Sequence, residues 1–288
     1  MTFFELFKNF FTHKDFLPAA DTIPGTLFTP LHFITAAILA VAVGLLVYFL
    51  RKQKEKTLNR LFTVLWAVSL VLEICKITWE TVCGKVIAFE WTGNIPLYPC
   101  SLFLYIMPFA IWGKGRIRQA ACGYVCTVGM IGGLINFVYP LNVLQNYSCI
   151  SFAGFHTLFY HAMLVFVAFL MLVTGYHSYK NVVGVLDLIT PLIPILIFSV
   201  PCHIVNMIIG ADYMFFRCTF GFLYPIGSKL PYAIAAIFVY IAYAIMCMGF
   251  YLPSFLCNRK AKKVSAQSAP NEEHPESETP SAFPQSKE

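Results

Sequence analysis

The sequence predicts an all-α fold, a polytopic membrane helix bundle of seven transmembrane helices. Two observations support this prediction. Of the 288 residues, 58% are hydrophobic and only 12% are charged, and the mean hydropathy is +0.70. A soluble domain averages about 25% charged residues. The apolar residues also fall into seven stretches of helix length separated by short loops, a pattern typical of helices that cross a bilayer.

Composition divides the chain into three parts. The segment 1–30 carries phenylalanines at helical spacing and is expected to form a short helix in the membrane interface, with a disordered apolar arm as the alternative. Those phenylalanines are Phe3, Phe4, Phe7, Phe10 and Phe11. Residues 31–255 form the seven-span membrane domain. The tail 256–288 becomes rich in Ser, Pro, Glu and Lys from Arg259 onward, which predicts a disordered cytoplasmic tail.

The seven spans follow from hydropathy and helix length. Their expected limits are Leu31–Leu50, Leu61–Val82, Pro96–Trp112, Ile117–Tyr139, Phe155–Thr174, Leu186–Ile209 and Pro231–Leu252. Three prolines within the sixth span predict a kink: Pro191, Pro194 and Pro201. A stripe of small residues on the fourth span predicts close helix packing: Cys122, Cys126, Gly129 and Gly133.

The loop cations predict an orientation. Alternate loops, beginning with 51–60, carry thirteen Lys and Arg residues, and the loops on the opposite side carry five. Because cytoplasmic loops are enriched in Lys and Arg, we expect the N-terminus outside and the C-terminus in the cytoplasm. The basic residues sit in short loops without interleaved aromatic residues, so the net charge of +6 does not indicate nucleic-acid binding. None of the ten cysteines has zinc-ligand spacing, and we expect no metal and no cofactor.

The second span contains three charged residues on one helical face. Glu73, Lys76 and Glu80 are spaced three and four residues apart. A charge at the bilayer centre costs about 2.5–3.5 kcal/mol on insertion scales. This face is therefore predicted to point into the bundle, with Lys76 paired to one or both carboxylates, either as a structural ion pair or as the lining of a polar cavity.

A candidate nucleophile lies in the run Pro96-Leu97-Tyr98-Pro99-Cys100-Ser101. Proline suits the first turn of a helix, so Cys100 is expected in the opening turns of the third span. The positive end of a helix dipole favours the thiolate. The alternative is a cysteine that packs as a small hydrophobic residue.

The predicted topology places further polar groups at the depth of Cys100. His161 enters from the same side on the fifth span, and the two lie about 6 and 9 Å below the surface at 1.5 Å per residue. Glu80, His203 and Asn206 lie near the outer ends of spans two and six.

A cysteine beside a histidine can act as a nucleophile with its general base, and the resulting thiolate attacks an acyl carbon. Asn206, the Ser101 hydroxyl or free helix N–H groups would then hold the oxyanion. His203 is a reserve candidate for the base. Glu80 is expected either to orient His161 or to balance Lys76.

Several motifs resemble a known family. The run Pro96–Ser101, the triplet Phe159-Tyr160-His161, the spacing from Asn206 to Asp212-Tyr213-Met214-Phe215, and Leu230-Pro231-Tyr232 together resemble the YwaF-like integral membrane family over about residues 25–255. That family is similar to transmembrane protein 164, a mammalian acyltransferase that moves acyl chains onto lyso ether phospholipids with a cysteine and a histidine.

The resemblance implies a catalytic pair of Cys100 and His161, membrane phospholipids or lysophospholipids as partners, and a bacterial plasma membrane location. It also places Asp212 among the supporting residues. The family usually reads Pro-Leu-His-Leu-Cys, whereas Tyr98 and Pro99 stand at the third and fourth positions here.

The sequence therefore favours acyl transfer or hydrolysis on phospholipid through a thioester on Cys100. Two alternatives remain open. The charged stripe of the second span and the kinked sixth span would suit a transporter or small-molecule receptor. A non-catalytic membrane scaffold with unknown protein partners is the other.

Overall fold

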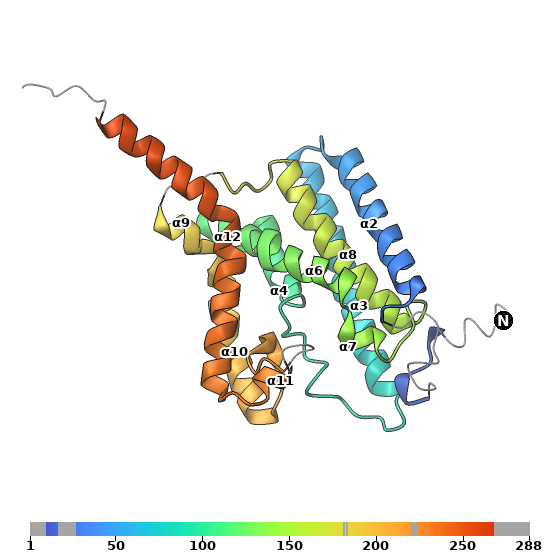
Figure 1. The fold of residues 1–288 in the computed structure, drawn as a ribbon. Helices are drawn as coiled ribbons and strands as arrows, with labels where there is room; N and C mark the ends of the chain where they lie inside the picture. The colour runs from blue at the N-terminus through green and yellow to red at the C-terminus, as the bar shows by residue number, and fades with distance from the viewer. Residues whose placement is uncertain (1–9, 17–26, 181, 183, 220–223, 268–288) are drawn as a thin grey trace, which may run out of the picture.

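The computed structural model describes residues 10–16, 27–180, 182, 184–219 and 224–267, and this part of the chain is helical with no strand. Figure 1 shows two groups of helices with α4 and α6 between them. One group holds α2 (Pro30–Leu50), α3 (Glu55–Val82) and α8 (Phe152–Val173). The other holds α10 (Ile193–Ile209) and α12 (Tyr232–Gln267). The predicted fold class, a polytopic membrane helix bundle, is confirmed.

Six helices in the described residues are long and apolar enough to cross a membrane: Pro30–Leu50, Glu55–Val82, Gly115–Val138, Phe152–Val173, Val185–Ile209 and Tyr232–Lys260. The expected third span is shorter. Its helix α4 covers only Phe103–Trp112, about 15 Å at 1.5 Å per residue, which is half of a hydrocarbon core. The second span begins at Glu55, six residues before the expected Leu61.

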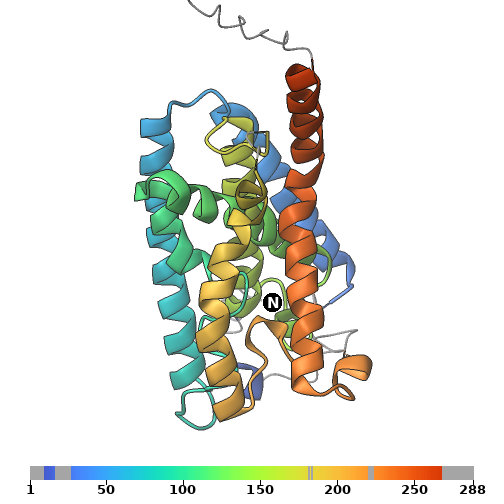
Figure 2. The same cartoon turned by 90° about the vertical axis from the view of Figure 1, so that its left-hand side faces the viewer.

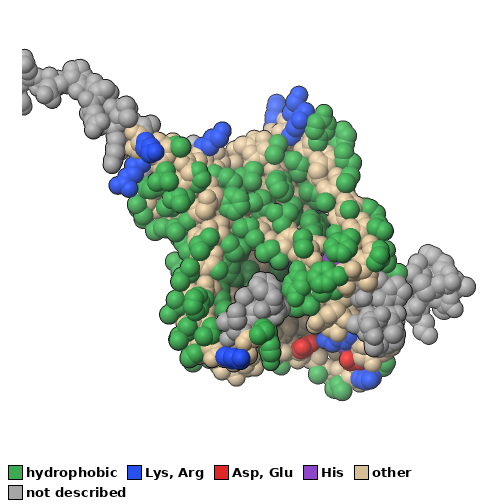
Figure 3. Space-filling model, in the orientation of Figure 1, with side chains coloured by type: hydrophobic (Ala, Val, Ile, Leu, Met, Phe, Trp, Pro, Cys, Tyr) green, Lys and Arg blue, Asp and Glu red, His purple; other side chains and the backbone are tan. Residues whose placement is uncertain are grey.

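Helix α8 forms the centre of the bundle. In its most apolar stretch of 18 residues, 78% of the residues are buried, whereas only 11% are buried in the corresponding stretch of α2. α8 packs against α2, α3 and α6 (Met130–Val138). Helix α2 is therefore peripheral and turns most of its apolar surface to lipid. The face in Figure 3 is hydrophobic over most of its height, hollowed between the two helix groups, and carries Lys and Arg at its two ends.

The fourth span is continuous but not uniformly α-helical. α5 (Gly115–Tyr124) passes into a π-helical turn at Val125–Gly129 and then into α6. The stripe of small residues packs as expected. The thiols of Cys122 and Cys126 are buried and lie 3.8 Å from the carbonyl oxygens of Ala110 and Ala168.

The sixth span is broken where its prolines predict. α9 (Val185–Ile189) is followed by a 3₁₀ turn at Thr190–Leu192, and α10 then begins at Ile193. Short connecting elements complete the described fold: η1 (Lys14–Phe16), α7 (Leu141–Leu144), η5 (Tyr213–Phe215) and α11 (Tyr224–Gly227).

Both ends of the chain extend beyond the described residues. Phe3, Phe4 and Phe7, on which the interfacial helix was predicted, lie outside them. The described part of this segment contacts the bundle, since the Trp79 indole N–H donates to the carbonyl of Phe11 at 2.9 Å. α12 runs the full height of the bundle (Figure 2) and continues to Gln267, so the tail expected from Arg259 starts as helix.

Candidate functional site

The residues Pro96–Ser101, hereafter the Cys100 loop, are not helical. Helix α4 begins at Phe103, with Leu102 as its N-cap, so the expectation that Cys100 lies in the opening turns of a helix is wrong. The Leu102 N–H instead closes a turn on the carbonyl of Tyr98 at 3.1 Å. The half-buried thiol of Cys100 therefore sits on an irregular segment just before the N-terminal end of α4.

Side chains from three other helices bind the backbone carbonyls of the Cys100 loop. The hydroxyl of Tyr124 on α5 donates to Pro99 at 2.5 Å, and that of Tyr160 on α8 donates to Cys100 at 3.2 Å. The Cys202 thiol on α10 lies 3.7 Å from the carbonyl oxygen of Leu97. Irregular backbone is tolerated at membrane depth only where protein groups satisfy it, so these contacts explain why the loop is stable without being a helix.

His161 is buried on α8 in a defined tautomer. Its Nδ1 donates to the backbone carbonyl of Thr157, one turn earlier, at 2.7 Å. A carbonyl can only accept a hydrogen bond, so Nδ1 carries a proton and, in the neutral ring, Nε2 carries the lone pair. This is the arrangement that a general base requires.

Glu73, Lys76 and His156 form a buried ionic group beside His161. The Lys76 ammonium lies 2.7 Å from Glu73 Oε1, and His156 Nε2 lies 3.4 Å from Glu73 Oε2. Glu73 and His156 are both buried, while the Lys76 side chain is 23% exposed. The second span therefore turns Glu73 and Lys76 into the protein, where Lys76 pairs with this carboxylate alone among the described residues.

The charges of Glu73 and Lys76 act on both the Cys100 thiol and the His161 ring. Tyr160 connects the two sides, because its ring stacks on His156 at 5.8 Å while its hydroxyl binds the Cys100 carbonyl. Among the described residues, no hydrogen bond joins the Cys100 sulfur directly to the His161 ring. The structure thus links the two groups through Tyr160, without a hydrogen bond between them.

Glu80 takes no part in this cluster. Its carboxylate lies 3.0 Å from His13 Nε2 and 3.9 Å from the Lys14 ammonium, and it accepts a hydrogen bond from the Tyr147 hydroxyl at 3.3 Å. Two helical turns, about 10 Å, separate Glu80 from Glu73 along α3. The expectation that Glu80 orients His161 or balances Lys76 is wrong, because Glu80 instead attaches the N-terminal segment to the bundle.

Asn206 binds the backbone of the loop after α10 and not the Cys100 loop. Its amide makes two hydrogen bonds with the backbone of Tyr213, at 2.9 and 2.8 Å. Tyr213 in turn stabilises the segment that precedes the Cys100 loop. Its hydroxyl donates to the Trp91 carbonyl at 2.7 Å and accepts from the Ile95 N–H at 3.1 Å. The Tyr98 ring packs on Tyr213 at 5.1 Å.

Asp212 organises the loop that follows α10. Its carboxylate accepts from the backbone N–H groups of Arg217 at 2.7 Å and Thr219 at 3.0 Å. These bonds stabilise a segment in which Met214, Phe215 and Cys218 all have positive φ angles. Asp212 is therefore a structural residue of this loop.

His203 has both ring nitrogens in use. They bind the hydroxyls of Tyr232 and Tyr240, and the ring stacks on Phe216 at 4.2 Å. These partners come from α12 and the loop after α10, so His203 belongs to a separate aromatic cluster. The reserve role as base at Cys100 has no support in this geometry.

Ser101 remains a candidate donor, because it directly follows Cys100 in the same loop. Tyr124 and Tyr160 were not predicted as site residues. A buried tyrosine hydroxyl in an apolar span needs a polar partner, and that requirement was the available signal. The partners themselves are backbone carbonyls 25 and 60 residues away.

The fold and the site define a polytopic membrane protein with a cysteine loop and a buried cluster of Glu73, Lys76 and two histidines inside its helix bundle. The chain matches the model of the TMEM164 family over residues 27–252 and belongs to that family. No curated protein and no solved structure matches it.

Proposed function

We propose that the protein is a phospholipid acyltransferase or acyl hydrolase that uses Cys100 as its nucleophile and His161 as its general base. One observation carries the proposal. Tyr160, the residue next to His161 on α8, binds the backbone of Cys100 itself, so the helix that carries the base also positions the nucleophile. The resemblance noted in the sequence implies the same pair.

The proposed reaction has two half-reactions. His161 Nε2 takes the thiol proton, and the sulfur of Cys100 attacks the ester carbonyl carbon of a phospholipid. The tetrahedral intermediate collapses as the lysophospholipid alkoxide leaves and receives the proton from the imidazolium, which gives a thioester on Cys100. A lysophospholipid hydroxyl or water then attacks that thioester while His161 takes its proton. The C–S bond breaks, the Cys100 sulfur takes the proton from the imidazolium, and a phospholipid or a free fatty acid leaves.

Two further groups have roles in this mechanism. Ser101 would donate to the oxyanion, because it directly follows Cys100 in the same loop. Glu73 would stabilise the imidazolium that forms on His161, since its negative charge acts on that ring. Both interactions strengthen as charge develops, which is the property that lowers a reaction barrier.

The test is mass spectrometry of the intact protein after incubation with phospholipid. We expect an acyl adduct on Cys100 that hydroxylamine releases, no adduct in Cys100→Ser, and loss of lipid turnover in both Cys100→Ser and His161→Ala. Because a nucleophile and its base act as a unit, the double variant should lose no more activity than either single variant.

Cys202→Ser and Cys75→Ser are the matched controls. Cys202 is buried and its thiol contacts the same loop, whereas Cys75 is exposed on α3. Both controls should retain the adduct. If the acyl group maps to another residue, or if Cys100→Ser retains turnover, the acyl-transfer mechanism is wrong and the transporter hypothesis takes its place.

A further inference from the structure

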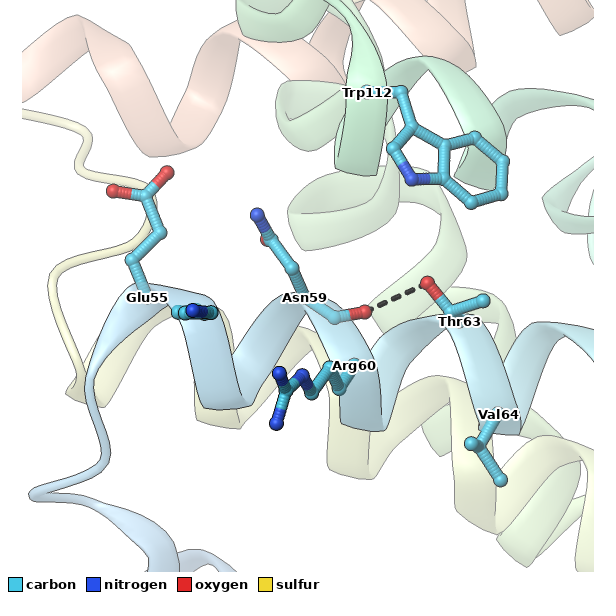
Figure 4. Close-up of a pocket in the computed structure, with 7 residues that line it drawn as sticks. Glu55, Asn59, Arg60, Thr63, Val64 and Trp112 are labelled. Atoms are coloured by element: carbon cyan, nitrogen blue, oxygen red, sulfur yellow. Dashed lines mark hydrogen bonds between the residues drawn. The ribbon is translucent and has the colours of Figure 1, made fainter.

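A second polar region lies at the other end of helix α3. The first three turns of α3 (Glu55–Val64) and Trp112 at the end of α4 line a cavity of about 790 Å³ (Figure 4). Arg60 precedes Glu73 by thirteen residues, about 20 Å along the helix, so this cavity is separate from the Cys100 site. Nothing in the proposed reaction uses it.

The cavity has a net positive lining. Lys56 and Arg60 are exposed and one helical turn apart, and within the described residues neither has an ion-pair partner. The acidic residue of the lining is neutralised, because the Glu55 carboxylate binds the Arg118 guanidinium at 2.5 Å. Two cations therefore remain for an anionic ligand.

A neutral hydrogen-bond donor lines the same cavity. The side-chain carbonyl of Asn59 accepts from the Tyr176 hydroxyl at 2.7 Å, which leaves its amide N–H₂ group as the donor toward the cavity. Figure 4 shows Asn59 between Glu55 and Thr63, on the side of α3 that faces Trp112. The Asn amide, the Lys ammonium and the Arg guanidinium can each donate a hydrogen bond to a phosphate oxygen.

The other end of the cavity is apolar. Val64 is 59% exposed and Trp112 is 56% exposed, at the point where α3 passes from its charged first turns into its apolar length. Trp112 packs edge-on against Trp66 at 5.8 Å. Tryptophan is enriched at membrane–water interfaces, where its ring lies at the level of lipid headgroups.

We propose that this cavity binds an anionic phospholipid of the surrounding leaflet. The phosphate lies between Lys56 and Arg60 with the Asn59 amide as a further donor, and the first acyl carbons lie against Val64 and Trp112. A free phosphate would use only the polar half of this lining. The combination of cationic and apolar walls at the bilayer boundary favours the intact lipid.

The test is native mass spectrometry of the full-length protein with added phosphatidylglycerol or phosphatidylcholine of identical acyl chains. The variant is Lys56→Gln/Arg60→Gln. Its matched control is Lys52→Gln/Lys54→Gln, which removes the same charge from exposed positions in the same stretch but outside the cavity lining. The soluble headgroup analogue glycerol 3-phosphate is the third arm.

The wild-type protein and the control should bind phosphatidylglycerol more tightly than phosphatidylcholine. The cavity variant should lose about a hundredfold in affinity for the anionic lipid, because each lining cation donates a charge-assisted hydrogen bond to the phosphate and the control cations do not. Equal binding of the two lipids by the wild-type protein, or equal losses in the variant and the control, would overturn the proposal. Displacement of the lipid by equimolar glycerol 3-phosphate would show a phosphate site and overturn it as well.

Discussion

The hydroxyl of Tyr160 donates to the backbone carbonyl of Cys100 across 3.2 Å, linking the central helix α8 to the loop that carries the candidate nucleophile. Through this bond, the Tyr160 side chain helps to position the backbone that carries the Cys100 sulfur. Its removal should therefore affect the proposed chemistry more than it affects folding.

Tyr160→Phe should lower the rate of thioester formation by about tenfold. An unsatisfied buried acceptor costs about 1–3 kcal/mol, and here part of that cost would appear as a displaced Cys100. Single-turnover formation of the acyl adduct measures the effect. Tyr179→Phe is the control, because it removes a comparable bond from a tyrosine hydroxyl to the Cys126 carbonyl. Equal rates in the two variants would show that the Tyr160 bond contributes only to stability.

A side chain at Gly133 should destabilise the packing of α6 against α8. A Cβ atom at this position would lie 2.6 Å from Val165 Cγ2 and 2.9 Å from the carbonyl oxygen of His161, so α6 and α8 must separate to admit it. We expect Gly133→Ala to lower the free energy of unfolding by about 1–3 kcal/mol. A Cβ atom on the neighbouring Gly132 would meet no described atom within 4 Å, so Gly132→Ala is the matched control. Unfolding in mixed detergent would compare the two, and equal stability would contradict the close approach.

Lys76→Met should destabilise the bundle by about 3 kcal/mol. Breaking a buried ion pair typically costs about 3–5 kcal/mol, and the partial exposure of Lys76 places it at the lower end. The double variant Glu73→Gln/Lys76→Met should recover part of this loss, because it removes the unpaired carboxylate as well. The same unfolding measurement tests both variants. A single variant as stable as the parent would show that water or lipid headgroups solvate the pair.

The predicted orientation is testable at an exposed position. Asn146 lies just after α7 and is exposed, unlike its buried neighbour Tyr147. In a background without the exposed thiols Cys75, Cys83 and Cys257, a membrane-impermeant maleimide should label Asn146→Cys in intact cells. A cysteine introduced at Ser277 in the tail should react only after the cells are permeabilised. Labelling of the tail in intact cells would reverse the orientation inferred from loop cations.

Hydropathy and spacing were enough to predict the bundle, the break before Ile193, and the ion pair of Glu73 with Lys76. Each of these depends on residues close together in sequence. The Cys100 loop was missed because local signals, two prolines before an apolar run, favour a helix start. The bonds that stabilise the loop come from Tyr124 and Tyr160, which local patterns do not connect to it.

The polar residues of the sixth span illustrate the same limit. Asn206 and His203 were placed near Cys100 by depth alone, and depth says nothing about direction around the helix axis. Asn206 binds the backbone of Tyr213, and His203 faces Tyr232 and Tyr240. Likewise, Glu80 shares a face with Glu73, yet its partners come from the N-terminal segment. Tertiary contacts decided which of these polar residues share a site.

The attachment of the Cys100 loop to α5, α8 and α10 has a mechanical consequence. A bilayer thinner or thicker than the spans changes the tilt of the helices within it. Tilting α10 against α8 would pull on Leu97 and Cys100 in different directions, because Cys202 binds one and Tyr160 binds the other. The distance between sulfur and imidazole would then vary with bilayer thickness, so that the length of the surrounding acyl chains would affect the rate of the proposed acyl transfer.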